Sequence, residues 1–95
     1  MPLSMPTRLF PLGTVVSTSG ALDLLSAHNQ SPFNLLALHQ SGHWGVVPPD
    51  DASENESALT SGARLMSAYI IGGERLLIIT EADRSSTTLL LPEEY

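Results

Sequence analysis

The stretch RLMSAYIIGGERLLIITE, residues 64–81, decides the fold of this chain. Its two strand-like runs flank Gly72-Gly73, a dipeptide typical of a two-residue β-hairpin turn. A turn at these glycines fixes which residues face one another across the two strands. The predicted register pairs Ile71 with Glu74, Ile70 with Arg75, Tyr69 with Leu76, Ala68 with Leu77, Ser67 with Ile78, Met66 with Ile79 and Leu65 with Thr80.

The open end of this hairpin carries opposite charges. One further step of the register places Arg64 directly across from Glu81. Such a cross-strand pair contributes at most about 1 kcal/mol, but its agreement with the turn supports the hairpin. We therefore predict a structural ion pair between Arg64 and Glu81.

A polar segment, Thr80 to Thr88, follows the hairpin and precedes a third predicted strand, Thr87 to Leu91. The segment holds two carboxylates, one arginine and five hydroxyls between two very apolar runs. A polar loop held by buried strands is a rigid place to display chemistry, although the same residues also suit a simple turn. With Glu81 paired to Arg64, Asp83 and Arg84 remain as the candidates for function.

Two helices are predicted upstream. Residues 21–28 have apolar side chains at helical spacing. Ser31 and Pro32 are a strong signal for the start of a second helix, which Gly42 ends. Its predicted apolar stripe consists of Phe33, Leu36 and Ala37, widened by Leu35 and Leu38.

A third helix is predicted over residues 50–61, ended by Gly62. Asp51 and Glu54 have the spacing of a capping box at its start. Few apolar residues lie on this helix, so most of its circumference should face water.

The order of these elements predicts an α+β fold. About three N-terminal helices should pack on one face of a C-terminal three-stranded antiparallel meander. Residues 8–16 look extended and include Pro11, which indicates an edge strand or a strap across the core. Ninety-five residues, 42% of them hydrophobic, suit a single domain over 1–95, with 1–7 as a loose arm.

Composition excludes several classes of function. Ten acids face four arginines and no lysine, a net charge of −6, so the basic footprint of a nucleic-acid-binding protein is absent. The lack of cysteine removes disulfides, thiolate zinc sites and thiol nucleophiles. Residues 1–11 lack the apolar core of a signal peptide, and no run has membrane-spanning length. We expect a cytoplasmic protein without a cofactor.

Catalytic and metal motifs are weak. His39 and His43 have the i, i+4 spacing of a helical metal pair, but Gly42 between them should end the helix, and no third ligand stands at suitable spacing. The histidines, including His28, are therefore interpreted as surface or helix-terminal residues, and no metal site is predicted. No serine lies in a Gly-x-Ser-x-Gly elbow. An enzyme is the less favoured reading.

The candidate partner-binding residues are acidic, with one tryptophan. An acidic cluster opens the third helix, where the helix dipole alone is a sufficient reason for negative charge. A lone tryptophan beside glycine serves either as an interface anchor or, more often, as a core residue. The predicted partner-binding set is Asp50, Asp51, Glu54, Glu56, Asp83, Arg84 and Trp44.

Several segments, in order, resemble a family of small bacterial proteins carried on plasmids and integrative elements. They are FPLG at 10–13, QSP at 30–32, HWG at 43–45, GARLMSAY at 62–69, IITEADRS at 78–85 and LLPEEY at 90–95. Members are labelled "plasmid-related protein" or "type I restriction endonuclease subunit M". The resemblance implies no settled activity and carries over no catalytic residue. The family pattern has an acid where this chain has His43, and a more charged segment after it.

These observations favour a non-enzymatic acidic module that binds a protein. The resemblance implies a setting in the contest between mobile DNA and host defence, where small acidic inhibitors of antirestriction or anti-CRISPR type act by binding. A host nuclease complex that targets nucleic acid is the expected partner. The alternative is a small enzyme or ligand-binding domain with a polar site at Arg64, Glu81, Asp83 and Arg84.

Overall fold

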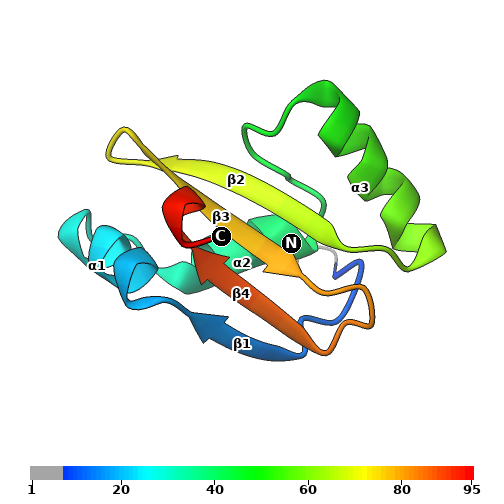
Figure 1. Cartoon of the computed structure of the whole chain (residues 1–95), viewed down its shortest axis with the longest axis horizontal. Helices are drawn as coiled ribbons and strands as arrows, with labels where there is room; N and C mark the ends of the chain where they lie inside the picture. The colour runs from blue at the N-terminus through cyan, green and yellow to red at the C-terminus, as the bar shows by residue number, and fades with distance from the viewer. Residues whose placement is uncertain (1–7) are drawn as a thin grey trace, which may run out of the picture.

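The computed structural model describes residues 8–95, so the predicted arm at 1–7 lies outside the described residues. Three helices and a four-stranded sheet confirm the α+β class (Figure 1). The elements in chain order are β1 (Thr14–Ser17), α1 (Ser19–Ala27), α2 (Pro32–Gln40), α3 (Pro49–Ser61), β2 (Leu65–Ile71), β3 (Glu74–Thr80), β4 (Ser86–Leu90) and the 3₁₀ turn η1 (Pro92–Glu94).

The β2–β3 hairpin confirms the predicted register at every residue pair, from Leu65 opposite Thr80 to Ile71 opposite Glu74. Gly72 and Gly73 both adopt positive φ, +57° and +83°. A two-residue turn of this kind needs left-handed backbone at both positions, which only glycine adopts at little cost. The turn chemistry therefore sets which residues pair across the two strands and on which face of the sheet each side chain lies.

The sheet is larger than the predicted meander. Its strand order is β1-β4-β3-β2, and β1 runs parallel to β4 while the other neighbours are antiparallel. The prediction of a three-stranded antiparallel meander is therefore corrected to a four-stranded mixed sheet, with the N-terminal strand at its edge. No short turn joins β1 to β4, so local sequence carries no signal for this pairing.

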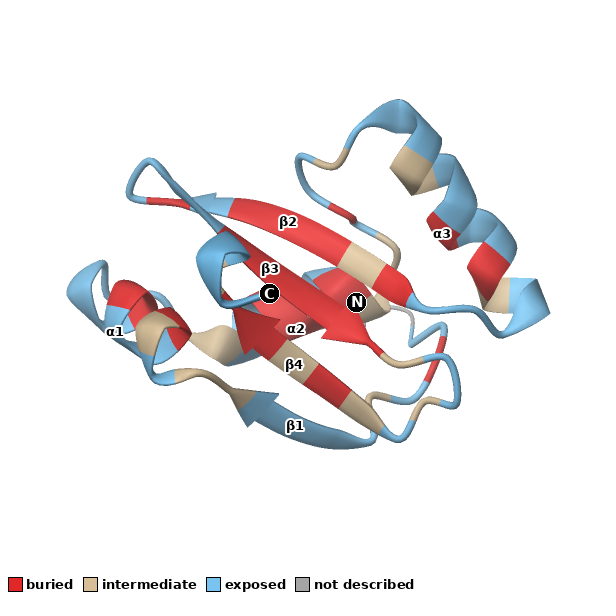
Figure 2. Ribbon diagram, in the orientation of Figure 1, coloured by how far each residue is buried: buried red, intermediate tan, exposed pale blue. Residues whose placement is uncertain are grey.

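The main core lies between the sheet and the helices α1 and α2. Its buried residues are Ala21, Leu24, Leu25, Leu35, Leu36, Tyr69, Ile71, Leu76, Ile78 and Leu89. Figure 2 shows this burial as red segments on the central strands, whereas β1 is almost entirely exposed. The prediction for Phe33 is wrong: it is 76% exposed, because α2 turns Leu35, Leu36 and His39 toward the sheet instead.

The helix α3 does not lie over the same face as α1 and α2. It lies beyond β2, at the opposite side of the sheet from β1 (Figure 1). Its buried Ala58 packs with Leu65, Phe10 and Trp44 in a second cluster. The predicted capping box is also wrong, because Pro48 is the N-cap and no side chain caps the helix; Gly62 ends it in the left-handed conformation, as predicted.

The outer edge of β2 is protected. Gly45 forms a parallel bridge with Ala68, through hydrogen bonds from Val46 N to Ala68 O (2.7 Å) and from Ala68 N to Trp44 O (3.1 Å). The Asn55 side chain from α3 then donates to Met66 O (2.8 Å) and accepts from Met66 N (3.1 Å). These contacts satisfy backbone groups that an edge strand would otherwise leave open to a second chain.

Replacing Asn55 by Ala should lower the free energy of unfolding by about 1–2 kcal/mol, because both Met66 backbone groups lose their partner. Urea unfolding at neutral pH measures the change, with Asn34→Ala on the exposed side of α2 as the control. If the change equals that of the control, the Asn55 side chain does not stabilise the edge of β2.

Candidate functional site

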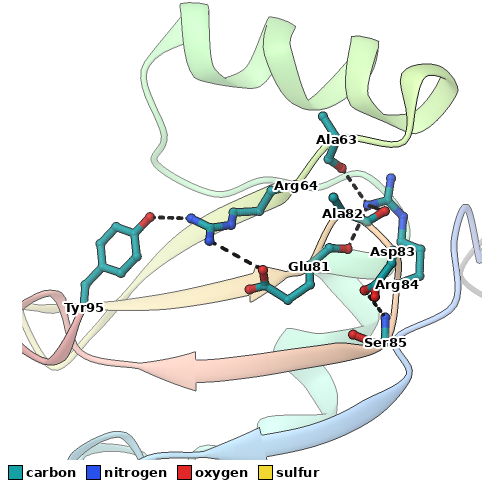
Figure 3. Close-up of polar contacts among 8 residues, drawn as sticks. All are labelled: Ala63, Arg64, Glu81, Ala82, Asp83, Arg84, Ser85 and Tyr95. Atoms are coloured by element: carbon teal, nitrogen blue, oxygen red, sulfur yellow. Dashed lines mark hydrogen bonds and ion pairs between the residues drawn. The ribbon is translucent and has the colours of Figure 1, made fainter.

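The predicted ion pair at the end of the hairpin is present. Arg64 Nη2 lies 3.5 Å from Glu81 Oε1, with both side chains partly exposed, and Arg64 Nη1 donates to the Tyr95 hydroxyl at 2.7 Å (Figure 3). A solvated pair at this distance contributes little to stability. It does orient the guanidinium beside the C-terminal residue.

Arg84 is bound within the fold. Its guanidinium donates to four backbone carbonyls: Ala63 O (2.6 Å), Ala58 O (3.0 Å), Glu81 O (3.1 Å) and Ala82 O (3.3 Å). It also lies 5.7 Å from the centre of the Phe10 ring, a cation–π contact. Ala58 O lies in the last turn of α3, so this side chain joins the helix end to the β3–β4 loop.

Asp83 is exposed, unlike the half-buried Glu81 and Arg84 of the same loop. Its Oδ1 accepts from Ser85 N at 2.9 Å (Figure 3), and hydrogen bonds from the hydroxyl and amide of Ser85 lower the pKa of this carboxyl. The turn closes through Glu81 N to Ser86 O (3.0 Å) and Arg84 N to Glu81 O (2.9 Å). The loop therefore uses most of its polar groups to fix its own shape.

A hollow of about 230 Å³ lies between the first two turns of α3 and the sheet. It is lined by Asp51, Glu54, Asn55, Arg64, Met66 and Tyr95. Two of the predicted acidic residues thus face a concave surface, and Asp50 lies exposed in the same first turn of the helix. The concavity is a feature that the sequence did not reveal.

Glu56 and Trp44 belong to a different part of the structure. Trp44 is only 6% exposed, which confirms the favoured reading of a core residue. Its Nε1 donates to Glu56 Oε2 at 2.8 Å, and its ring stacks on Phe10. Glu56 therefore provides the hydrogen-bond acceptor for the buried indole N–H, and neither residue lines the hollow.

Sequence reasoning missed a buried polar network centred on His39. This residue is fully buried, so the surface reading of His39 is wrong. Its Nδ1 lies 2.6 Å from Ser67 Oγ and its Nε2 lies 2.9 Å from Thr80 Oγ1. Thr80 Oγ1 in turn lies 2.7 Å from Thr87 Oγ1, which donates to Leu12 O at 2.7 Å.

The chain of hydrogen bonds fixes the histidine tautomer. Because Thr87 gives its one hydrogen to the Leu12 carbonyl, it must accept from Thr80. Thr80 then accepts from Nε2–H of His39, and Nδ1 accepts from the Ser67 hydroxyl. Burial, together with the charge of Arg84, lowers the pKa of His39 to about 4, so the ring is neutral at pH 7.

This network is structural. Ser67, Thr80, Thr87 and His39 are all 0% exposed, so a substrate cannot reach the Ser67 hydroxyl. The predicted register already placed Ser67 and Thr80 on the face of Tyr69 and Leu76. Two hydroxyls on a core face need a polar partner, and from this requirement a buried polar residue such as His39 could have been predicted.

The candidate metal ligands and the helices were compared with what a metal site and a membrane span require. Within residues 8–95, no three histidine or acidic side chains converge on a point that suits a metal ion. His39 is buried while His43 is exposed, so the pair at i, i+4 does not share a surface. None of the helices in the described part of the chain has the length and apolarity needed to cross a membrane.

The fold and hollow together define a small acidic α+β protein with a concave patch beside one helix. Comparison with known proteins identifies no relative: no family model matches the chain, and neither a curated protein nor a solved structure matches it.

Proposed function

We propose that this protein is a non-enzymatic interaction module that binds a basic surface of a protein partner through α3. The observation that supports this most directly is the hollow of about 230 Å³ at which Asp51 and Glu54 lie beside the Asn55 amide. Arg64 also lines the hollow, but its guanidinium is paired with Glu81, outside the hollow. The two carboxylates of α3 suit an arginine or lysine side chain, because charge-assisted hydrogen bonds to carboxylates are strong and directional.

The class of partner follows from the charge and from the resemblance described above. A net charge of −6 attracts a cationic surface, such as the nucleic-acid-binding face of a nuclease complex. The resemblance to proteins of mobile elements supports a host defence complex as that partner. The module would then occupy a groove that otherwise takes nucleic acid, an antirestriction or anti-CRISPR mode of action.

The alternative site at Arg64, Glu81, Asp83 and Arg84 has less support. Arg84 donates to four carbonyls, Glu81 pairs with Arg64, and Asp83 accepts from Ser85. Of the four, Arg64 alone lines the hollow beside α3. An interaction role through α3 therefore uses groups that remain available, whereas the alternative needs groups already engaged.

Neutralising the hollow should weaken binding. We expect purified wild-type protein to bind at least one restriction or CRISPR effector complex, and Asp51→Asn/Glu54→Gln to raise Kd at least about tenfold. Isothermal titration at two salt concentrations measures the affinity and its screening. The matched control, Asp23→Asn/Glu74→Gln, removes two exposed carboxylates elsewhere, so both variants change the net charge from −6 to −4.

Equal weakening by the two variants would show that general charge, rather than α3, drives association. Absence of binding to every complex at micromolar concentration would contradict the defence partner. A small metabolite that copurifies with the protein and binds at Arg64 and Glu81 would favour the alternative.

A further inference from the structure

The two edges of the sheet differ in a way that the α3 proposal does not explain. Trp44 to Val46 and the Asn55 side chain occupy the edge of β2. Among residues 8–95, no segment pairs with the outer edge of β1, the opposite edge strand (Figure 1). Unprotected edge strands readily pair with another chain, so native proteins usually cover or charge them.

The backbone of β1 presents a defined set of free groups. Thr14 N donates to Ser85 O, just before β4, and Thr18 N, just after β1, donates to Leu89 O of β4. Because N–H and C=O groups alternate in direction along a strand, the groups of Val15 and Ser17 point away from the sheet. An antiparallel partner strand forms its hydrogen bonds with residues two positions apart whose backbone groups point outward, as those of Val15 and Ser17 do.

The side chains next to this edge are apolar and exposed. Val15 and Val16 are 43% and 46% exposed, on opposite faces of the sheet, and Phe33 of α2 is 76% exposed. Val15 and Phe33 line a second hollow of about 360 Å³ with Leu12, Leu36 and Ala37. Figure 2 shows β1 pale blue along the lower edge of the sheet. An exposed apolar strip beside a bare edge indicates an interface.

The charge distribution selects the occupant. Residues 8–49 hold one carboxylate, Asp23, and one arginine, Arg8, whereas residues 50–95 hold nine of the ten acids. One of those nine, Glu94, accepts from the Thr18 hydroxyl at the end of β1 (2.6 Å), and Arg8 lines the hollow beside Val15, so these two charges near the edge balance. A cationic partner would find little to attract it at β1. A second copy of this chain, which is repelled elsewhere by its net charge of −6, can approach at this nearly neutral edge.

We propose that the protein forms a twofold dimer through antiparallel pairing of β1 with β1 of a second copy. With the axis at Val16, Val15 of each copy exchanges backbone hydrogen bonds with Ser17 of the other, and the two sheets join into one of eight strands. The axis is perpendicular to the sheet, so both α2 helices lie on the same side. Phe33 of each copy then lies toward the seam.

The strand has only four residues, so the interface is small. A small interface of this kind gives a weak dimer, with Kd on the order of 10–100 μM. Sedimentation equilibrium of the full chain over this range should therefore show a monomer–dimer transition.

Val16→Lys places two like charges at the axis and should raise the dimer Kd at least about tenfold. Phe33→Lys, at a helix position that is 76% exposed, tests the same seam if Val16→Lys fails to fold. Ile70→Lys is the matched control, because Ile70 is 50% exposed on β2, the opposite edge strand. It should dimerise as the wild type does.

A wild-type protein that stays monomeric at about 0.5 mM would overturn the proposal. The proposal would be overturned even if β1 then proved to pair with a peptide from another protein. A dimer that Ile70→Lys disrupts as strongly as Val16→Lys, or one that neither β1 nor α2 variant weakens, would also overturn it.

Discussion

Replacing His39 by Gln should make the free energy of unfolding nearly independent of pH between 6.5 and 4, whereas the wild-type protein should lose stability over this range. The native pKa of His39, about 4, lies below its unfolded value of 6.5, so the unfolded chain binds a proton that the native state excludes. The stability that neutral His39 contributes is complete above pH 6.5, declines as pH falls from 6.5 to 4, and falls no further below pH 4. The full difference corresponds to about 3 kcal/mol.

Urea unfolding at half-unit steps between pH 7 and pH 5 measures this effect. About 2 kcal/mol of the loss should fall above pH 5, before carboxyl groups with lowered pKa values, such as Asp83 and Glu94, begin to contribute. His39→Gln should be less stable at pH 7 but nearly flat over this interval. His43→Gln, at an exposed position, should keep the wild-type slope. A wild-type slope in His39→Gln would contradict a neutral buried ring.

Arg84→Met should lower the free energy of unfolding by about 2–4 kcal/mol, because four carbonyls lose a charged donor and Phe10 loses its cation–π partner. Arg84→Lys should have an intermediate free energy of unfolding, because a single ammonium group cannot reach all four carbonyls. Chemical denaturation at pH 7 gives both values.

The control for this substitution is Arg75→Met, which removes an exposed arginine near the hairpin turn. It should change stability by less than about 0.5 kcal/mol. If Arg84→Met matches this control, the side chain does not hold the loop to α3, and a role for Arg84 at the surface would regain support.

Local features of the sequence predicted the hairpin because the two glycines determine its register without help from the rest of the chain. The start of α2 at Ser31 and the end of α3 at Gly62 were predicted for the same reason. The parallel pairing of β1 with β4 was not, because it joins residues about 70 positions apart along the chain. Phe33 was misplaced because apolar spacing alone does not say which side of a helix meets the core.

The candidate site likewise contains contacts that could be predicted from local sequence and contacts that could not. The pairing of Arg64 with Glu81 followed from the register, and the structure confirms it. The role of Arg84 did not, because its four acceptors are carbonyls from three separate segments. The hollow beside Asp51 and Glu54 also needed tertiary structure, since Arg64, Met66 and Tyr95 complete it from elsewhere in the chain.

The central claim, that α3 is the partner-binding face, is tested most directly by site-specific photo-crosslinking in cells of the native host. A photoreactive residue at exposed Ser53 on α3 should give a crosslink to a defence nuclease subunit, and Asp51→Asn/Glu54→Gln should markedly reduce its yield. The same photoreactive residue in place of exposed Ile70, which lies on β2 but does not line the hollow, should give no such crosslink. A defence-complex crosslink from position 70 but not from position 53 would contradict the claim.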